Sequence, residues 1–155
     1  MIKKELTKSE AKEKALRLLG FRAHSEKELK EKLLRAGADE EDLPDIMTFL
    51  KEYGFINDES YAEGLAKDLK NIKKYGKKRI LGELLNRGIS REYAEAAISE
   101  LSDDEEDMLL PLVERKLGGN FERKNIDRAI RYFIYHGYDF DDIKRCIEKI
   151  TSTEN

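Results

Sequence analysis

Residues 29–37, Leu-Lys-Glu-Lys-Leu-Leu-Arg-Ala-Gly, carry a pattern that recurs twice further along the chain, ending at Gly88 and at Gly137. An apolar residue stands eight positions before each of the three glycines, another stands four before, and another six after. These nine residues are Leu29, Leu33 and Leu43; Ile80, Leu84 and Ala94; and Ala129, Phe133 and Ile143. Positions four apart share one face of a helix, and glycine readily takes the left-handed conformation that ends one. The pattern therefore predicts three copies of one helical unit.

The rest of the chain has the same helical character. Apolar residues recur at spacings of three and four throughout, and no segment keeps the period of two that a strand requires. Nine such apolar stripes predict an all-α fold of three tandem three-helix repeats. The expected boundaries are 1–57 for an N-terminal tail and the first repeat, 58–101 for the second, and 102–155 for the third with a short C-terminal tail. Because such repeats stack on their neighbours, we expect an elongated curved rod.

One residue interrupts the helical pattern. Pro111 stands about two turns inside the seventh apolar stripe, between Leu109 and Leu112. Proline lacks the amide hydrogen that a helix needs, and its ring clashes with the preceding turn. We therefore expect a kink or a break in the helix near residues 109–111.

Composition limits the classes of protein to which the chain can belong. Charged residues make up 41% of the 155 residues, against about a quarter in ordinary compact domains, which favours an elongated shape with much surface. The single cysteine and the two histidines exclude an internal disulfide and a structural zinc site. No apolar run approaches the length of a membrane span, and the first twenty residues lack the apolar segment of a signal peptide. We expect a soluble, cytoplasmic protein that does not bind a membrane.

No catalytic motif is found in the sequence. It contains no phosphate-binding loop, no HExxH, no GxSxG and no paired cysteines. Cys146 lies on an apolar helical stripe, while His24 and His136 stand at expected helix ends. The acidic run at residues 103–107 is typical of the first turn of a helix, and its consecutive side chains point in different directions. We therefore expect no enzyme activity, no metal, no cofactor and no small-molecule substrate.

The strongest positive signal is a concentration of basic residues. Residues 66–91 contain nine Lys or Arg residues and only two acidic ones, whereas residues 92–107 contain eight acidic residues and no basic one. We call the central residues of this segment the basic band: Lys70, Lys73, Lys74, Lys77, Lys78, Arg79 and Arg87. It is either a solvated helix face or a binding face for a negatively charged partner, such as a nucleic acid backbone or an acidic protein groove.

Aromatic residues are concentrated near the C-terminal end. Five of the thirteen aromatic residues fall within residues 132–140. Phe133 continues the apolar stripe and is expected in the core, whereas Tyr132 and Tyr135 lie off it. Tyrosine is favoured at interfaces, so the two tyrosines are either packing residues of the third repeat or contacts to a partner.

Three segments resemble one known family. Residues 22–33, from Arg22 through Ser25 and Glu28-Leu29 to Lys32-Leu33, resemble the first-repeat signature of the RecX regulatory proteins. Residues 53–62, Tyr-Gly-Phe-Ile-Asn-Asp-Glu-Ser-Tyr-Ala, are similar to the junction into the family's second repeat. Residues 74–89 resemble the second-repeat signature, although Lys77 stands where the family often has proline. A looser likeness to the third repeat spans residues 131–143, and the resemblance covers residues 9–150 in all.

The resemblance implies a function as well as a fold. Members of the RecX family are all-α proteins of three three-helix repeats that modulate the recombinase RecA. They bind in the helical groove of the RecA–single-stranded DNA filament and typically suppress ATP hydrolysis and strand exchange. For this chain it implies a cytoplasmic regulator of homologous recombination, DNA repair and the SOS response. Closed repeats with capped ends favour a monomer. The expected contacts with the filament or its single-stranded DNA are the basic band, with Arg22, Lys27, Tyr132 and Tyr135 as further partner contacts.

Two other functions remain open. One is a DNA-binding protein built from trihelical repeats that acts without RecA, as helix-turn-helix modules do. It predicts tight binding to DNA alone that weakens steeply with salt. The other is a helical adaptor whose partner has no link to DNA, and it predicts no effect on a recombinase.

Overall fold

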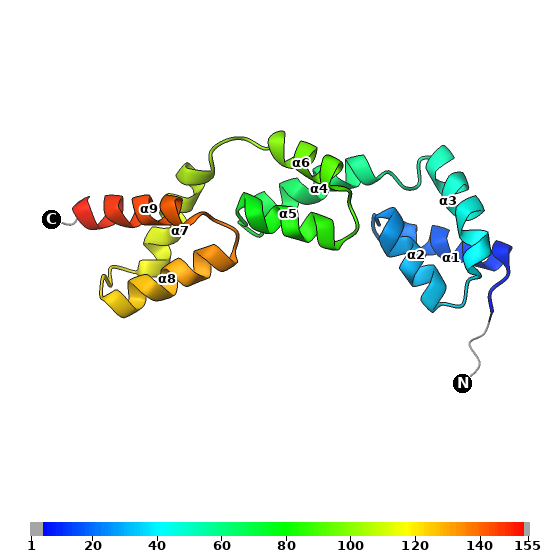
Figure 1. The fold of residues 1–155 in the computed structure, drawn as a ribbon, viewed down its shortest axis with the longest axis horizontal. Coiled ribbons are helices and arrows are strands. Elements are labelled where there is room, and N and C mark those ends of the chain that lie inside the picture. Colours follow the sequence, from blue (N-terminus) through cyan, green and yellow to red (C-terminus); the bar gives the residue numbers. More distant parts are fainter. Residues whose placement is uncertain (1–4, 154–155) are drawn as a thin grey trace. The chain divides into compact units, whose positions relative to one another are not determined.

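The computed structural model describes residues 5–153, and every regular element in that range is helical (Figure 1). The outermost residues of the two expected tails, 1–4 and 154–155, lie outside the described range. The elements are α1 (Lys8–Phe21), α2 (Glu26–Arg35), the short 3-10 helix η1 (Glu40–Asp42), α3 (Leu43–Glu52), α4 (Asp58–Asn71), α5 (Lys77–Asn86), α6 (Arg91–Ser99), α7 (Glu105–Leu117), α8 (Arg123–Tyr135) and α9 (Phe140–Thr153). The expectation of an all-α chain with three helices in each repeat is confirmed.

The three aligned glycines end equivalent helices in the same way. Gly37, Gly88 and Gly137 have φ angles of 105°, 87° and 98°, which side-chain-bearing residues rarely adopt. In each case the amide of the following residue donates to the carbonyl five residues earlier, as Ala38 does to Leu33 at 2.9 Å. This hydrogen bond is the one that closes a helix in the Schellman motif. All nine aligned apolar residues are buried, which confirms the repeat alignment.

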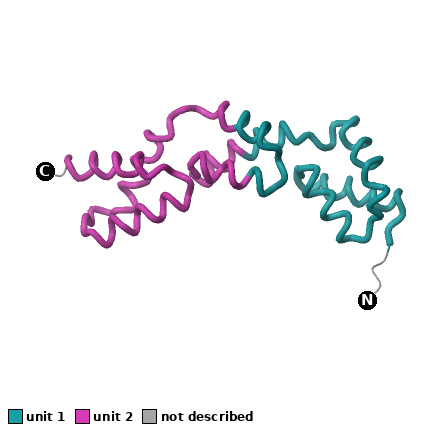
Figure 2. Tube along the Cα trace, in the orientation of Figure 1, with its two compact units in different colours: residues 1–65, 84–97 teal, residues 66–83, 98–155 magenta. Residues whose placement is uncertain are grey.

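The chain divides into two compact units, shown in different colours in Figure 2. Unit 1 comprises residues 1–65 and 84–97, and unit 2 comprises residues 66–83 and 98–155. Within unit 1, residues such as Ala15, Leu33 and Leu50 form a buried core. Within unit 2, α7, α8 and α9 supply the core, with Val113, Phe133 and Ile147 among its residues. The rod expected for the whole chain stays a prediction.

Within unit 1, the start of α2 packs on the turn that ends α5. Ser25 caps α2 in a capping box with Glu28, and its hydroxyl donates to the carbonyl of Arg87 at 2.5 Å. A Cβ added to Gly88 would lie 2.4 Å from the Cβ of Lys27, so the lysine stem covers the glycine closely. The helix start of one repeat is thereby fixed to the glycine turn of the next.

Within unit 2, the start of α5 packs on the turn that ends α8 in an equivalent arrangement. The amide of Gly76 donates to the carbonyl of His136 at 2.8 Å. A Cβ on Gly76 would lie 2.4 Å from the carbonyl oxygen of Gly137, and one on Gly137 would lie 2.3 Å from the amide nitrogen of Arg79. Backbone therefore meets backbone here, and neither glycine leaves room for a side chain.

α7 runs through Pro111 from Glu105 to Leu117, so the helix is not broken there, and a kink at this residue stays a prediction. A proline in this place deprives only one carbonyl, that of Asp107, of its helical hydrogen bond. Asp107 and Pro111 are both exposed, so water can reach the unpaired carbonyl.

Leu29 and Leu84 test the repeat alignment, because both are fully buried. We expect Leu29→Ala and Leu84→Ala each to lower the free energy of unfolding by about 2–5 kcal/mol. Urea denaturation followed by circular dichroism measures the loss. Leu34→Ala is the control on the same helix as Leu29, since Leu34 is 38% exposed. A loss below about 1 kcal/mol at either buried leucine would contradict the alignment.

The two glycines at and within α5 should respond in opposite ways to alanine. Gly76→Ala places a methyl group against the backbone of Gly137, so we expect a loss of about 1–3 kcal/mol in unfolding free energy. Gly82 has no atom within 4 Å of an added Cβ and lies inside the helix. Gly82→Ala should therefore stabilise the chain by about 0.5–1 kcal/mol. Thermal unfolding of the two variants measures both effects. A neutral Gly76→Ala would disprove the close packing of Gly76 on Gly137.

Candidate functional site: a cationic surface on unit 2

The first residue of the basic band is not at the surface. The Lys70 side chain is buried, and its ammonium lies 2.7 Å from the carbonyl of Ser102, 2.7 Å from the Ser102 hydroxyl and 2.5 Å from Asp104. This hydrogen bond from Lys70 holds the pKa of Asp104 below its usual value. Lys70 thus ties the end of α4 to the segment before α7, and the expectation that it contacts a partner is corrected.

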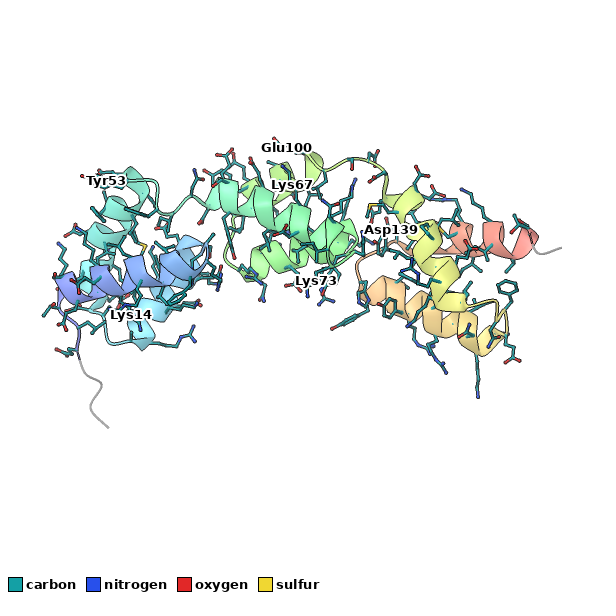
Figure 3. The ribbon with its side chains drawn as sticks, turned by 180° about the vertical axis from the view of Figure 1, so that it is seen from behind. Lys14, Tyr53, Lys67, Lys73, Glu100 and Asp139 are labelled. Atoms are coloured by element: carbon teal, nitrogen blue, oxygen red, sulfur yellow. The ribbon has the colours of Figure 1, made fainter. Side chains whose placement is uncertain are left out.

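Three further cations of the band are paired with acidic residues of unit 2. Lys77 lies 3.4 Å from Asp103, Lys78 lies 2.5 Å from Asp139, and Arg79 lies 2.9 Å from Glu83. The ion pair and hydrogen bond to Asp139, labelled in Figure 3, raise the pKa of Lys78. Lys78 remains well exposed, but these acids offset part of the positive charge that the sequence suggested.

Arg79 has a structural task in addition to its ion pair. Its guanidinium donates to the carbonyl of Tyr135 at 3.1 Å and lies 4.7 Å from the ring centres of both Tyr75 and Tyr135. Arginine stacked between two rings and bonded to the end of α8 is held in place. Tyr135 is 68% exposed despite this contact, so its outer surface stays accessible.

Lys73 and Lys74 are the exposed cations of the band that carry no ion pair within the described residues. They follow α4, and Figure 3 labels Lys73. Lys74 has a φ angle of 60°, in the left-handed region that glycine usually fills. The hydroxyl of Tyr138 donates to the Lys74 carbonyl at 2.7 Å. Burial, followed by the nearby charge of Glu105, raises the pKa of Tyr138 to about 12.

Glu105 substitutes for the side-chain cap that Gly76 cannot supply to α5. Its carboxylate accepts from the amide of Lys77 at 3.2 Å, at the positive end of the helix. Burial raises the pKa of Glu105, and the hydrogen bond from Lys77 opposes that rise. The hydrogen bonds of Glu105 and Tyr138 therefore hold the turn that carries Lys73 and Lys74 against the rest of unit 2.

Beside these lysines lies a surface depression of about 350 Å³, which we call the hollow. Its lining residues come from three segments: Lys73 and Lys74; Leu112, Arg115 and Lys116; and Tyr132, Phe133 and His136. Four of the eight are permanent cations and none is acidic. The ammonium of Lys116 lies 4.0 Å from the centre of the Tyr132 ring, which also stacks on the His136 ring at 4.0 Å.

The sequence reasoning missed Arg115, Lys116 and His136. Lys116 follows Leu112, and His136 follows Tyr132, at the four-residue spacing that places side chains on one helix face. No other signal was available, because these residues lie far from Lys73 and Lys74 in the sequence and only folding brings them close.

Arg22, Lys27 and Arg87 lie in unit 1 and contribute to its packing. Arg22 forms an ion pair with Glu28 at 2.9 Å, and Arg87 donates to the Tyr61 hydroxyl at 3.1 Å. Burial favours a raised pKa for Glu28, but the hydrogen bonds from Arg22, Tyr61 and the Ser25 amide together outweigh it, and the pKa is lowered. Arg22 and Arg87 are paired with Glu28 within unit 1, whereas Lys27 packs its stem on Gly88 and stays exposed.

The residues considered for catalysis occupy structural positions. Cys146 is buried, and burial raises the pKa of its thiol, which disfavours the reactive thiolate. His24 is buried between the carbonyl of Arg22 and the ammonium of Lys32, and burial lowers its pKa. Residues 5–153 hold no cluster of three or more His, Cys, Asp or Glu suited to a metal ion. In the same range no helix combines the length and apolar character needed to cross a membrane.

Comparison with known proteins places the chain in a family. Residues 11–50 match the family model of the first three-helix domain of RecX, and residues 57–98 match that of the second. Over 144 residues the chain is 37% identical to the regulatory protein RecX of Clostridioides difficile, covering 90% of this chain and 68% of that protein. This chain belongs to the RecX family.

Other RecX proteins extend the match over nearly the whole chain. The regulatory protein RecX of Clostridium perfringens strain 13 is 30% identical over 162 residues, covering 97% of this chain and 75% of that protein. The crystal structure of RecX from Lactobacillus salivarius superposes with a TM-score of 0.80 at 24% identity, covering 93% of this chain and 96% of that one. A second RecX crystal structure gives 0.82 at 17% identity, covering 91% of this chain and 73% of the other. The two structures support the fold alone.

The RecX domain models end at residue 98, so the hollow includes residues beyond their range. In this RecX-family chain, the α7 and α8 residues of the hollow belong to the third repeat. The relatives carry the name of regulatory proteins.

The buried phenol of Tyr138 should make stability depend on alkaline pH. Its pKa is about 12 in the folded chain and near 10.0 when exposed, so above pH 10 ionisation favours the unfolded state. We expect the unfolding free energy to fall between about pH 9 and 11 by about 1 kcal/mol more in the wild type than in Tyr138→Phe, by linkage. Urea titrations at the two pH values measure this. Equal slopes in the two proteins would contradict a buried, neutral Tyr138.

Proposed function

We propose that this chain regulates the recombinase RecA by binding in the helical groove of the RecA–single-stranded DNA filament, where it suppresses ATP hydrolysis and strand exchange. It would act as a monomer in the cytoplasm, in recombinational DNA repair and the SOS response. Membership in the RecX family supports a regulatory role. The observation that carries the choice of surface is the exposed, unpaired pair Lys73 and Lys74.

Energetics explain why these two lysines matter more than the rest of the band. An exposed ion pair contributes at most about 1 kcal/mol, so no single contact can hold the chain on a filament. Lys77, Lys78 and Arg79 must give up or share an acidic partner before they bind an anion. Lys73 and Lys74 bear no such cost, and several weak contacts along a repeating filament add up to firm binding.

Lys77, Lys78 and Arg79 form the periphery of the proposed surface. The Lys78 ammonium is held by one exposed acid, Asp139, so an anionic partner can compete for it. Next to Lys78 in the sequence, Arg79 stacks its guanidinium on the ring of Tyr135. Tyr132 lines the hollow together with Lys73 and Lys74.

The test is the single-stranded-DNA-dependent ATPase of RecA, titrated with this chain from substoichiometric to equimolar amounts. We expect the wild type to suppress the ATPase. The double variant Lys73→Glu/Lys74→Glu should need at least about tenfold more protein, since about 1.4 kcal/mol of lost binding corresponds to that factor. The control is Lys124→Glu/Lys144→Glu, which makes the same change in net charge at exposed residues of α8 and α9.

The outcomes separate the possible functions. Equal suppression by both double variants would remove Lys73 and Lys74 from the binding surface. An ATPase unaffected by the wild type would refute the proposed function. Tight, salt-sensitive binding to DNA in the absence of RecA would then favour a trihelical DNA-binding protein. Circular dichroism of each variant confirms that the helices are intact.

A further inference from the structure

The hollow combines two chemical features that rarely meet on a solvated helix face. Its rim carries Lys73, Lys74, Arg115 and Lys116, and no acidic side chain lines it. Its wall carries the Tyr132 ring, 40% exposed and stacked on His136. The cations select an anionic ligand, and the ring selects one with a flat face.

An aromatic ring among cations is the arrangement that binds single-stranded nucleic acid. Cations follow the phosphates, while a ring accepts an unstacked base without regard to its identity. A duplex buries its base faces in its own stack and cannot offer one to Tyr132. An acidic peptide would use the cations but would leave the ring without a role. The volume of the hollow, about 350 Å³, is at the lower end of the range for small-ligand sites.

We propose that the hollow binds one nucleotide of a single strand, with its base stacked on Tyr132 and its flanking phosphates held by Lys73, Lys74 and Arg115. In the free protein the Lys116 ammonium lies over the Tyr132 ring, 4.0 Å from its centre. The base replaces that ammonium, which turns outward on its flexible stem to a phosphate. The exchange is favourable because stacking of a base on a ring is stronger than an exposed cation–ring contact.

The geometry of the hollow is set before any strand arrives. Tyr132 is fixed by an edge contact to the buried Phe133 ring at 5.0 Å and by His136, whose Nδ1 lies 2.7 Å from the Tyr132 carbonyl. The turn bearing Lys74 is fixed by Tyr138. Binding therefore orders few groups beyond the lysine side chains, which keeps the entropic cost low.

This inference deepens the proposed function and rests on it for the source of the strand, which is the DNA inside the filament. It adds that the chain touches that DNA directly through one base. The experiment below detects the base contact without RecA, so each claim can fail separately.

Fluorescence anisotropy with the full chain compares two labelled strands of about 15 units, an oligothymidylate and an abasic phosphodeoxyribose strand of the same length. Both carry the same phosphates, and only one carries bases. We expect the wild type to bind the oligothymidylate roughly fivefold or more tightly, the effect of one stacked base. Tyr132→Ala should remove this preference and retain the abasic affinity, whereas Tyr132→Phe should keep the preference.

Two matched variants locate the contact. Tyr93→Ala removes a tyrosine of similar exposure, 39% against 40% for Tyr132, from α6 of unit 1 and should leave the preference unchanged. Lys116→Ala should weaken binding of both strands by a similar factor while keeping the preference, because the ring stays available. Lys124→Ala, an exposed lysine eight residues before Tyr132 on α8, should leave both affinities unchanged.

Several results would overturn the inference. Equal affinity of the wild type for the two strands rules out a base contact. Loss of the preference in Tyr93→Ala as well as in Tyr132→Ala assigns it to general aromatic character. Displacement of the strand by polyglutamate at equal charge concentration, with Tyr132→Ala behaving as the wild type, assigns the hollow to an acidic protein.

Parallel ATPase measurements with RecA separate the two proposals. If the wild type suppresses the ATPase but shows no base preference, this inference fails and the proposed function stands. If it shows the preference but has no effect on RecA, the proposed function fails and the hollow remains a site for single strands.

Discussion

The close approach of Gly76 to Gly137 is the constraint on which the cationic surface depends. Each glycine lies where a Cβ would meet the backbone of the opposite segment. The contact holds the turn after α4 against the end of α8, and this brings Lys73 and Lys74 beside residues some 40 to 60 positions later in the chain. The equivalent contact in unit 1, between Ser25 and the Arg87–Gly88 turn, joins the first two repeats by the same rule. The same type of junction thus occurs twice in the chain, and the junction between Gly76 and Gly137 also forms the hollow.

The positive charge that this surface presents depends on which basic residues are paired with acids, and not only on how many basic residues there are. The acidic residues after α6 and before α9 supply counterions to Lys70, Lys77 and Lys78. A segment that reads as strongly basic therefore presents only part of its charge to a partner. Lys73 and Lys74, which form no ion pair within residues 5–153, lie in the turn between α4 and α5. Arg115 and Lys116 from α7 line the same hollow. The third repeat both masks one part of the basic band and extends the other.

Sequence patterns predicted the repeats well because their determinants are local. Helical spacing and a left-handed glycine are properties of neighbouring residues, so the nine aligned apolar positions and the three turns could be found before the structure. The burial of Lys70 could not be found, since its partners lie 32 and 34 residues away. The hollow was missed for the same reason. A break at Pro111, one of the two expected outcomes there, does not occur because a helix can lose one exposed hydrogen bond without breaking. The positions of side chains were predicted correctly where the local sequence determines them. They were missed where packing between repeats determines them.

Lys74 holds a backbone conformation that glycine adopts at lower cost. A left-handed conformation costs a residue with a side chain about 1–2 kcal/mol, a cost that glycine avoids. A glycine at position 74 would meet every backbone requirement of the turn, including the hydrogen bond that the Lys74 carbonyl accepts from Tyr138. The lysine side chain is exposed and forms no ion pair within residues 5–153. In the proposed binding of an anionic partner, the Lys74 ammonium, which lines the hollow together with Lys73, offsets this strain.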